Sequence, residues 1–339
     1  MNLQHRIDLL ARLGAYILSA EEGWMQAKEL AGRKNSWFTT EFINRAIQQI
    51  ANQYLEPEIL TGWVKQYAVP EKNPAPKSVG VVMAGNIPLV GFHDFLCVFI
   101  SGHRIRIKAS AKDEVLLKHL AGKLTEWEPG LQPQILFEEM LQGCDAYIAT
   151  GSNNTSRYFE YYFGKYPHII RRNRTSVAIL DGTETAEELE RLADDVYLYF
   201  GLGCRNVTKL LVPPGYDFIP LLQAFSKYNY LADNNKYKNN YDYNLALLML
   251  NKQQYMSNES ILLTEDKSLF SPISRLNYEY YKSEDTVMKD LAGTEEIQCI
   301  LGHRQIPFGS AQEPGINDFA DGRNTLEFLL TIGASAQTA

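Results

Sequence analysis

The chain has 339 residues, enough for two domains or for one large α/β domain with an appendage. Hydrophobic residues make up 45% and charged residues 22%, as in ordinary globular proteins, and the net charge of −7 argues against nucleic acid as the main partner. The four cysteines lie far apart without a CxxC pair, so neither a zinc site nor a disulfide framework is indicated. Because the first residues lack a signal peptide's apolar core and no apolar run reaches membrane-spanning length, a reducing cytoplasm is the expected location.

The first 70 residues are predicted to form a helical section. Apolar residues recur at helical spacing over residues 3–17, and Thr39-Thr40 provide caps for a second helix whose apolar face covers 42–50. A third helix should end before Pro70. Three prolines within residues 70–77 indicate a linker into the next unit.

From residue 78 onward, short strands alternate with helices. The predicted strands cover residues 79–83, 104–108, 146–149, 177–180 and 209–212. The predicted helices cover residues 88–100, 113–127, 155–163, 186–200 and 218–227. This alternation predicts an α/β fold with mostly parallel strands, in which ligands bind at the carboxyl ends of the strands. Residues 227–244, rich in Asn and Tyr, are interpreted as an extended polar–aromatic surface segment.

Three loops that follow predicted strands carry candidate functional residues. Asn86 could donate its amide to an oxyanion, although on sequence alone a cap for its own helix is the favoured interpretation. Lys108 and Ser110 suit a ribose or phosphate, and a solvated basic turn is an equal alternative. Gly151 and Ser152 open a helix whose amide groups attract phosphate, but the full GxGxxG pattern is missing.

The fourth loop contains Cys204, directly after Gly201 and Gly203. A thiol on such a flexible turn can be approached closely by a substrate, and its thiolate is a strong nucleophile when neighbouring groups lower its pKa. The alternative is an inert buried cysteine, which is the more frequent case inside cells. Cys97 and Cys299 lie in apolar runs and fit that inert case better.

The ordered set of loops resembles the aldehyde dehydrogenase superfamily and, within it, the acyl-CoA reductases of the LuxC type. The superfamily's Asn-x-Pro, Lys-Pro-Ser, Thr-Gly-Ser and Gly-x-x-Cys turns correspond to residues 86–88, 108–110, 150–152 and 201–204. Residues 295–299 and 307–310 resemble its C-terminal landmarks. Each motif alone is weak, whereas their order and spacing together are specific.

The resemblance implies an aldehyde-dehydrogenase-like α/β fold with a Rossmann-type nucleotide-binding domain and an α/β catalytic domain. Residues 1–70 would be a helical section packed on the nucleotide-binding domain of residues 71–175. Residues 176–310 would form the catalytic domain that carries Cys204. Residues 311–339 would return to the nucleotide-binding domain or to an interface, and a homo-oligomer is expected.

The resemblance also implies roles for individual residues. Asn86 and the backbone N–H of Cys204 would form the oxyanion hole. Lys108, Ser110, Gly151 and Ser152 would contact the dinucleotide. Glu296 would contact its nicotinamide ribose, although the flanking residues depart from the usual Glu-x-Phe-Gly-Pro. No metal is implied.

Two departures from the superfamily pattern bear on the reaction. Aldehyde-oxidising members carry a Glu-Leu-Gly-Gly tract whose Glu activates the hydrolytic water, whereas residues 171–176 here contain no carboxylate. The arginines of this stretch would suit a CoA phosphate, with a solvated basic turn as the alternative. Ala111 and Lys112 stand where NAD-preferring relatives often place a Glu, so nothing repels a 2′-phosphate.

The sequence therefore predicts NADPH-dependent reduction of an acyl-CoA, with a fatty acyl group expected, to the aldehyde through a Cys204-bound acyl-enzyme. NADH remains a second cofactor option, and CoA is the leaving group or co-substrate. The rival hypotheses are an aldehyde dehydrogenase that forms free acid and a non-catalytic nucleotide-binding protein. The length of the acyl chain cannot be read from the sequence.

Overall fold

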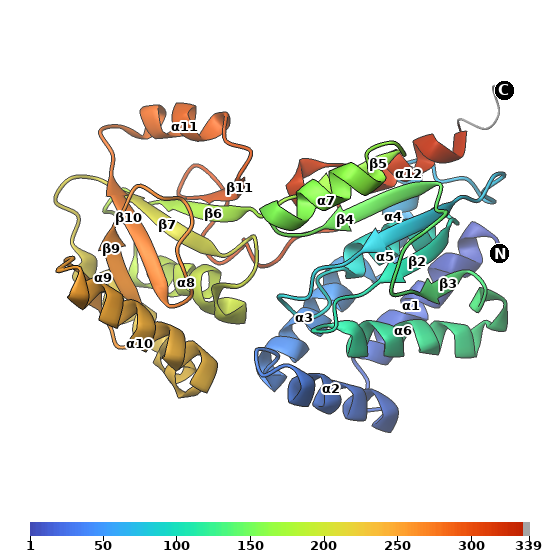
Figure 1. The fold of residues 1–339 in the computed structure, drawn as a ribbon, viewed down its shortest axis with the longest axis horizontal. Coiled ribbons are helices and arrows are strands. Elements are labelled where there is room, and N and C mark those ends of the chain that lie inside the picture. Colours follow the sequence, from blue (N-terminus) through green and yellow to red (C-terminus); the bar gives the residue numbers. More distant parts are fainter. Residues whose placement is uncertain (335–339) are drawn as a thin grey trace. The chain divides into compact units, whose positions relative to one another are not determined.

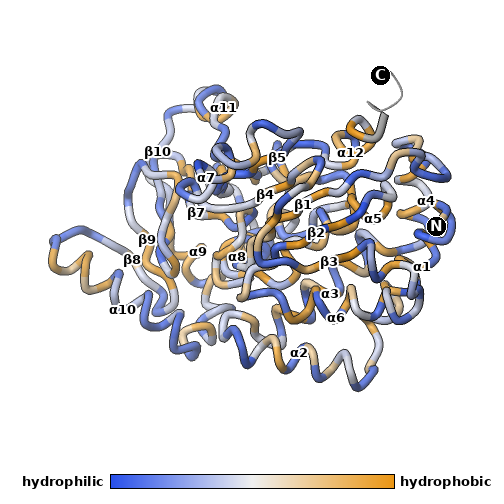
Figure 2. The backbone as a smooth tube through the Cα atoms, turned by 45° about the vertical axis from the view of Figure 1, so that its right-hand side comes forward, coloured by the Kyte–Doolittle hydropathy of each residue, from blue (hydrophilic) through white to orange (hydrophobic). Residues whose placement is uncertain are grey.

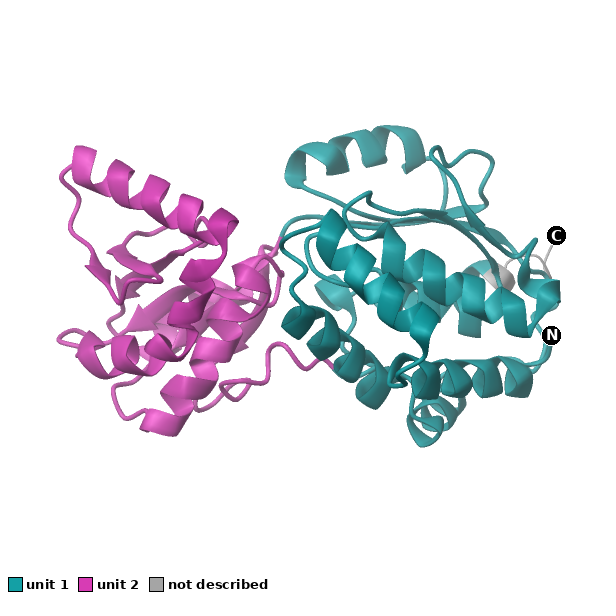
Figure 3. Cartoon of the chain, turned by 90° about the horizontal axis from the view of Figure 1, so that it is seen from below, with its two compact units in different colours: residues 1–173, 315–339 teal, residues 174–314 magenta. Residues whose placement is uncertain are grey.

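The computed structural model describes residues 1–334, which form two compact units (Figure 3). Unit 1 comprises Met1–Asn173 and the chain from Gly315 onward, and unit 2 comprises Arg174–Pro314. The chain therefore passes between the units twice. The last five residues of the predicted C-terminal segment, 335–339, lie outside the described residues.

Unit 1 begins with four helices rather than the three predicted. They are α1 (Leu3–Ile17), α2 (Glu22–Lys34), α3 (Thr40–Tyr54) and α4 (Pro57–Gln66). The Asn2 and Thr39 side chains cap α1 and α3 by accepting backbone N–H groups. The sequence did not reveal α2 because its buried face holds only Trp24, Ala27 and Ala31, a weak apolar pattern.

A five-stranded parallel sheet, called sheet A, forms the centre of unit 1 (Figure 1). Its strands are β1 (Ser78–Val82), β2 (Arg104–Lys108), β3 (Ile135–Phe137), β4 (Ala146–Thr150) and β5 (His168–Arg171), in the order β3-β2-β1-β4-β5. The crossover elements are α5 (Phe92–Ile100), α6 (Glu114–Trp127), a 3₁₀ turn (Pro129–Leu131) and α7 (Asn153–Phe163), and α12 (Thr325–Ala334) follows the return from unit 2. The strand order reverses between β1 and β4, which marks the position where doubly wound sheets bind ligands.

The two faces of sheet A are covered differently because side chains alternate along each strand. Val79 and Val81 belong to the large core that also includes residues of α1–α6 and α12. Figure 2 shows hydrophobic residues along α5, next to these strands. Val82 and Tyr147 belong to the smaller core of the other face, where Phe159 of α7 packs.

Unit 2 is built on a six-stranded sheet, called sheet B, with the order β11-β6-β7-β10-β9-β8. Its strands are β6 (Thr175–Ile179), β7 (Val207–Val212), β8 (Met256–Ser257), β9 (Leu262–Glu265), β10 (Arg275–Tyr280) and β11 (Ile297–Leu301), all parallel except β8. Its helices are α8 (Ala186–Tyr197), α9 (Phe218–Phe225), α10 (Asn235–Leu250) and α11 (Glu284–Ala292). Parallel sheets with crossover helices in both units confirm the predicted α/β class.

Two segments differ from the sequence-based expectation. Residues 227–244 are helical rather than extended: a 3₁₀ turn (Ser226–Asp233) leads into α10, which buries Tyr237, Tyr241 and Asn244 at helical spacing. The polar Asn residues between them obscured that pattern. Helix α5 begins at Phe92 rather than at residue 88, because the preceding residues form a tight turn in which Leu89 has a φ of 57°.

Candidate active site

Three loops of unit 1 meet at the carboxyl edge of sheet A. Strand β2 ends at Lys108, the turn after β1 carries Asn86, and β4 runs into Gly151. Val82 of β1 lies opposite Lys108 on one side and Ala149 on the other, so the three loops are neighbours. They also flank the point where the strand order reverses, the usual ligand position in this architecture.

The Asn86 turn and the Ser110 turn are in contact. A Cβ atom on Gly85 would lie 2.6 Å from both Cβ and Oγ of Ser110, so a larger residue does not fit at this position. The backbone N–H of Met83 donates to the carbonyl of Lys108 over 3.0 Å. This close approach places the half-buried Asn86 beside the end of β2.

Asp113 hydrogen-bonds the backbone that follows Asn86, a role that was not predicted from the sequence. Its buried carboxyl accepts hydrogen bonds from the backbone N–H groups of Leu89 and Val90. Burial raises the pKa of Asp113 to about 8, against the opposite effect of these two hydrogen bonds. Asp113 is also the N-cap residue of α6, an ordinary position for Asp, so nothing in the sequence distinguishes it.

Gly151 and Ser152 form the junction between β4 and α7. The Ser152 hydroxyl caps α7 by accepting the N–H of Thr155 over 3.3 Å. A Cβ atom on Gly151 would lie 2.8 Å from a ring carbon of Phe159, so glycine allows the helix to pack closely against the strand. The amino end of α7, with its positive dipole, therefore lies at the carboxyl edge of sheet A.

Cys204 lies at the opposite kind of strand end. It occupies the turn that immediately precedes β7, so it lies at the amino edge of sheet B, whereas the general rule for parallel sheets favours carboxyl edges. Its side chain is half-buried, whereas Cys97, Cys144 and Cys299 are buried. The Ser176 hydroxyl of β6 donates to the Cys204 carbonyl over 3.1 Å and fixes the turn against the neighbouring strand.

Glu296 lies at this same amino edge. It immediately precedes β11, is exposed, and its backbone carbonyl accepts the N–H of Thr175 over 2.9 Å. Because β6 lies between β7 and β11, the sheet brings Cys204 and Glu296 to one edge of unit 2. The guanidinium of Arg205 donates to the sulfur of Cys299 over 3.3 Å at this edge.

Arg171 does not serve the anionic ligand that the sequence suggested for residues 171–176. Its side chain is buried, pairs with the buried carboxylate of Asp94, and donates to the Thr325 hydroxyl over 2.7 Å. Arg172 pairs with Glu160 at the surface, and Arg174 donates to the carbonyl of Ile297. The first arginine is therefore a structural element of unit 1, where it ties β5 to α5 and α12.

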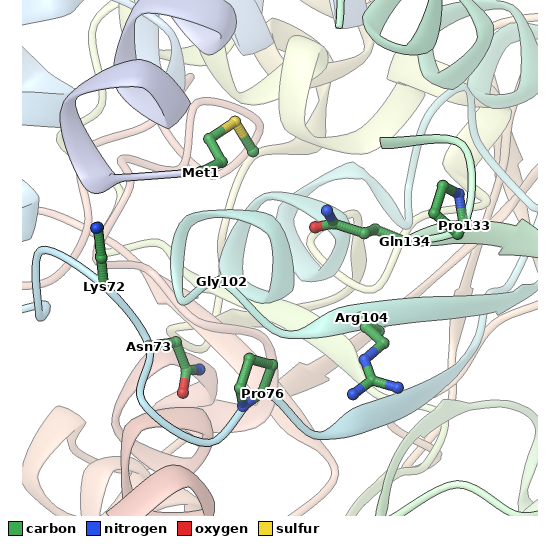
Figure 4. A pocket seen from close by; sticks show the side chains of 8 residues that line it. All are labelled: Met1, Lys72, Asn73, Pro76, Gly102, Arg104, Pro133 and Gln134. Atoms are coloured by element: carbon green, nitrogen blue, oxygen red, sulfur yellow. The ribbon is translucent and has the colours of Figure 1, made fainter. Parts of the chain in front are cut away.

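Figure 4 shows a cavity of about 470 Å³ that includes Arg104, the first residue of β2. The cavity therefore opens at the amino edge of sheet A, whereas Asn86 and Gly151 lie at the carboxyl edge. It is lined by Met1, Lys72, Asn73, Pro76, Gly102, Arg104, Pro133 and Gln134. None of the candidate residues from the sequence lines this cavity.

None of the helices in residues 1–334 is both long and apolar enough to cross a membrane.

The sequence profile of a family described as acyl-CoA reductase (LuxC) matches residues 25–215. The chain belongs to this family. The matched region includes Asn86, Lys108, Ser110, Gly151 and Cys204, and Glu296 lies beyond it. Membership identifies the protein as an oxidoreductase of the acyl-CoA reductase type. No curated protein matches the chain.

Solved aldehyde dehydrogenases share the fold of this acyl-CoA reductase family member. Aldehyde dehydrogenase 21 from Physcomitrella patens, solved with succinate, gives a TM-score of 0.71 at 10% identity and covers 98% of this chain and 84% of its own. The Mycobacterium tuberculosis aldehyde dehydrogenase complexed with NAD⁺ gives a TM-score of 0.62 at 14% identity. The match covers 85% of this chain and 70% of that enzyme. The Bacillus cereus aldehyde dehydrogenase in complex with NAD⁺ gives a TM-score of 0.63 at 14% identity. The match covers 89% of this chain and 72% of that enzyme. These likenesses confirm the predicted aldehyde-dehydrogenase-like fold.

Proposed function

We propose that this protein reduces an acyl-CoA thioester to the aldehyde, using NADPH and a Cys204-bound acyl-enzyme. The observation that carries this proposal is the half-buried Cys204 thiol on its held turn, within the stretch that matches the acyl-CoA reductase family. The other three cysteines are buried, which leaves Cys204 as the thiol best placed to meet a substrate.

In the proposed reaction, the Cys204 thiolate attacks the thioester carbonyl carbon, and a new carbon–sulfur bond forms. The family resemblance assigns two hydrogen-bond donors to the oxyanion, the Asn86 amide and the backbone N–H of Cys204. The bond to the CoA sulfur breaks, and CoA leaves as the thiolate. Cys204 then holds the acyl group as a thioester.

Lys108, Ser110, Gly151 and Ser152 would hold a nicotinamide cofactor, as the family resemblance implies, and the cofactor would supply a hydride. The Cys204-bound thioester would then become a thiohemiacetal alkoxide on Cys204. The resemblance assigns the same two donors to the oxygen as it gains negative charge again. When this thiohemiacetal alkoxide collapses, the carbonyl re-forms and the carbon–sulfur bond breaks, with no proton gained or lost. The aldehyde leaves, and the Cys204 thiolate is restored for the next turnover.

The carboxyl edge of sheet A fits a dinucleotide. Lys108, Ala111 and Lys112 are exposed there, and the amino end of α7 offers a positive dipole for a phosphate. The one carboxylate of this turn, Asp113, is buried against the backbone of Leu89 and Val90. An exposed basic turn without an exposed carboxylate supports NADPH, with NADH as the second option.

Transfer of the acyl group to and from CoA is favoured over hydrolysis. Residues 171–176 provide no carboxylate to activate water. Two carboxylates pair with this stretch: Asp94 is buried against Arg171, and Glu160 pairs with Arg172 at the surface of unit 1. We further propose a fatty acyl substrate, because the family resemblance is to the enzymes that supply fatty aldehyde. We also propose a reducing cytoplasm as the location, because the chain has only four cysteines. A homo-oligomer is proposed from the family resemblance.

A panel of acyl-CoAs of increasing chain length, assayed with NADPH and with NADH, tests the function. We expect one CoA thiol released and one aldehyde formed for each NADPH oxidised, with faster turnover on longer chains. Aldehyde and NADP⁺, incubated with and without CoA, form the reverse test. Free acid formed without CoA would contradict the proposal and favour an aldehyde dehydrogenase. A Cys204 that alkylates no faster than a small free thiol would favour a non-catalytic protein.

A further inference from the structure

The turn that presents Cys204 contains an unusual backbone. Helix α8 ends at Tyr197, and the following Tyr199, Phe200 and Gly201 have φ angles of 55°, 56° and 71°. Only glycine adopts this left-handed region without strain, so Tyr199 and Phe200 are held there by their surroundings. The predicted helix over residues 186–200 is wrong for its last three residues for this reason. Such strain persists only where the surrounding structure compensates it.

One buried side chain connects the two ends of this turn. Asn206 is fully buried, and its amide nitrogen donates to the carbonyls of Asp195, Val196 and Leu198 over 3.0, 3.4 and 2.9 Å. These are carbonyls that a helix leaves without partners at its carboxyl end. Its amide oxygen accepts the N–H of Gly203 over 2.8 Å. Asn206 thus joins the end of α8 to the residue immediately before Cys204.

The backbone of Asn206 strengthens the same arrangement. Its N–H donates to the carbonyl of Gly203 over 3.1 Å, and its carbonyl accepts the N–H of Ser176 over 3.1 Å. The Ser176 hydroxyl also donates to the Cys204 carbonyl. Hydrogen bonds with β6 and with Asn206 therefore fix the turn at Cys204 and at the neighbouring Gly203. The position of the Cys204 thiol and N–H relative to sheet B therefore depends on Asn206.

The end of α8 is itself fixed by a second buried group. The Asp195 carboxylate accepts the backbone N–H groups of Gly309 and Ala311, the latter over 3.0 Å. Asp195 is fully buried. The carbonyls that accept from Asn206 therefore belong to a helix end that residues 309–311 also hydrogen-bond through Asp195. Asn206 thus connects the cysteine turn to a helix end that is fixed by other contacts.

We propose that Asn206 is the positioning residue of the nucleophile turn: it holds the turn, including the strained residues Tyr199 and Phe200, so that the thiol and backbone N–H of Cys204 are aligned for acylation. This proposal rests on the proposed role of Cys204 as the nucleophile. Asn206 does not touch the substrate. It acts by keeping the turn from relaxing toward an ordinary helix end, which would displace both the sulfur and the N–H donor.

The test compares Asn206→Ala with Asn277→Ala, a matched control. Asn277 is a buried asparagine of the same unit whose amide also donates to backbone carbonyls, those of Ser268 and Phe270, but it lies on β10. The first measurement is the rate of Cys204 alkylation by iodoacetamide as a function of pH, with each cysteine resolved by peptide mass spectrometry. It requires no acyl-CoA and is made well below the unfolding temperature of both variants.

We expect Asn206→Ala to slow Cys204 alkylation and to move its pH midpoint upward, while Asn277→Ala matches the wild type. In the acyl-CoA assay, Asn206→Ala should lower kcat about 100-fold, the usual cost of misplacing a reacting group by about 1 Å, with KM little changed. The milder Asn206→Ser variant, whose hydroxyl keeps one partner, should lie between Asn206→Ala and the wild type in both measurements.

Equal changes in the two alanine variants would make Asn206 an ordinary structural residue and would overturn the proposal. The proposal is also lost if both Asn206 variants fail to fold while Asn277→Ala folds, because Asn206 would then govern folding rather than the turn. If the wild type reduces no acyl-CoA, the proposed function fails, but the alkylation profiles still decide whether Asn206 positions Cys204.

Discussion

The two sheets carry their candidate residues at opposite ends of their strands. In sheet A, Asn86, Lys108 and Gly151 lie at the carboxyl edge, on both sides of the position where the strand order reverses. In sheet B, Cys204 and Glu296 lie at the amino edge, immediately before β7 and β11. The candidate residues of unit 1 therefore follow the rule that parallel sheets bind ligands at carboxyl ends, and those of unit 2 depart from it.

The two edges are also held by different means. The loops of sheet A rely on close glycine contacts, such as Gly85 against Ser110, and on backbone hydrogen bonds. The turn of sheet B relies on buried polar side chains, chiefly Asn206 and Asp195. The difference suits the proposed roles, because a cofactor edge needs room for a ligand, whereas a nucleophile must be fixed in one orientation.

The largest expected effect is loss of the nucleophile at the amino edge of sheet B. Cys204→Ser should lower acyl-CoA-driven NADPH oxidation at least about 1,000-fold, because a hydroxyl is a far weaker nucleophile than a thiolate at neutral pH. The control is Cys144→Ala, which changes a buried cysteine of unit 1 and should keep turnover near the wild-type value. Comparable losses of turnover in both variants would contradict the role of Cys204 as the nucleophile.

The next largest effect concerns stability at the end of β5. Asp94→Ala leaves the Arg171 guanidinium buried without its carboxylate and should cost about 3–5 kcal/mol of unfolding free energy. The exposed pair of Arg172 and Glu160 is the comparison, and Glu160→Ala should cost about 0–1 kcal/mol. Urea unfolding of both variants measures the difference. Similar small losses would mean that Arg171 is available to a ligand after all.

A third prediction compares the two edges of sheet A. Asn86→Ala should slow the chemical step about 100- to 1,000-fold, as expected for a lost oxyanion donor, with NADPH affinity unchanged. The control is Asn73→Ala, which alters the cavity at the amino edge of the same sheet and should leave the chemical step unchanged. Single-turnover kinetics and fluorescence titration separate the two quantities. Equal loss of rate and affinity in Asn86→Ala would indicate a structural role.

Regular strands and helices with a clear apolar period were predictable from the sequence. The strand over residues 104–108 alternates cleanly and was placed correctly, as were the helices whose apolar faces are broad. Residues 198–200 were assigned to the end of the helix over 186–200, whereas α8 ends at Tyr197 and the left-handed backbone of Tyr199 and Phe200 depends on tertiary contacts through Asn206. Local propensity contains no record of such contacts.

The candidate site was predictable only in part, for a related physical reason. Motif order singled out the residues that would touch a ligand, including Cys204 and Asn86. The residues that hold them, Asn206, Asp195 and Asp113, are ordinary polar residues in the sequence. Their importance lies in burial and in backbone partners that are distant along the chain. Arg171 shows the converse, since a basic run suggested a ligand but its first member is enclosed by Asp94 and Thr325.

The smallest expected effect tests the carboxyl edge of sheet B, where the rule would have placed the chemistry. His303 follows β11 and contacts Asp181, which follows β6, over 2.8 Å, and Glu188 over 3.3 Å. The hydrogen bond to Asp181 raises the pKa of His303 above its usual value of 6.5, against a smaller effect of burial. Because the folded pKa is the higher one, this stabilisation is complete below pH 6.5 and is lost as the pH rises through the raised pKa.

His303→Gln should therefore lower the unfolding free energy at pH 5.5 by about 1 kcal/mol or less, since the pair is partly exposed, and should have no effect at pH 8.5. The difference at pH 5.5 should shrink in 1 M NaCl, because salt screens surface charges. Acyl-CoA turnover should stay at the wild-type rate at both pH values. A tenfold fall in turnover would contradict the assignment, because this carboxyl edge would then take part in the chemistry and the contrast between the two sheets would disappear.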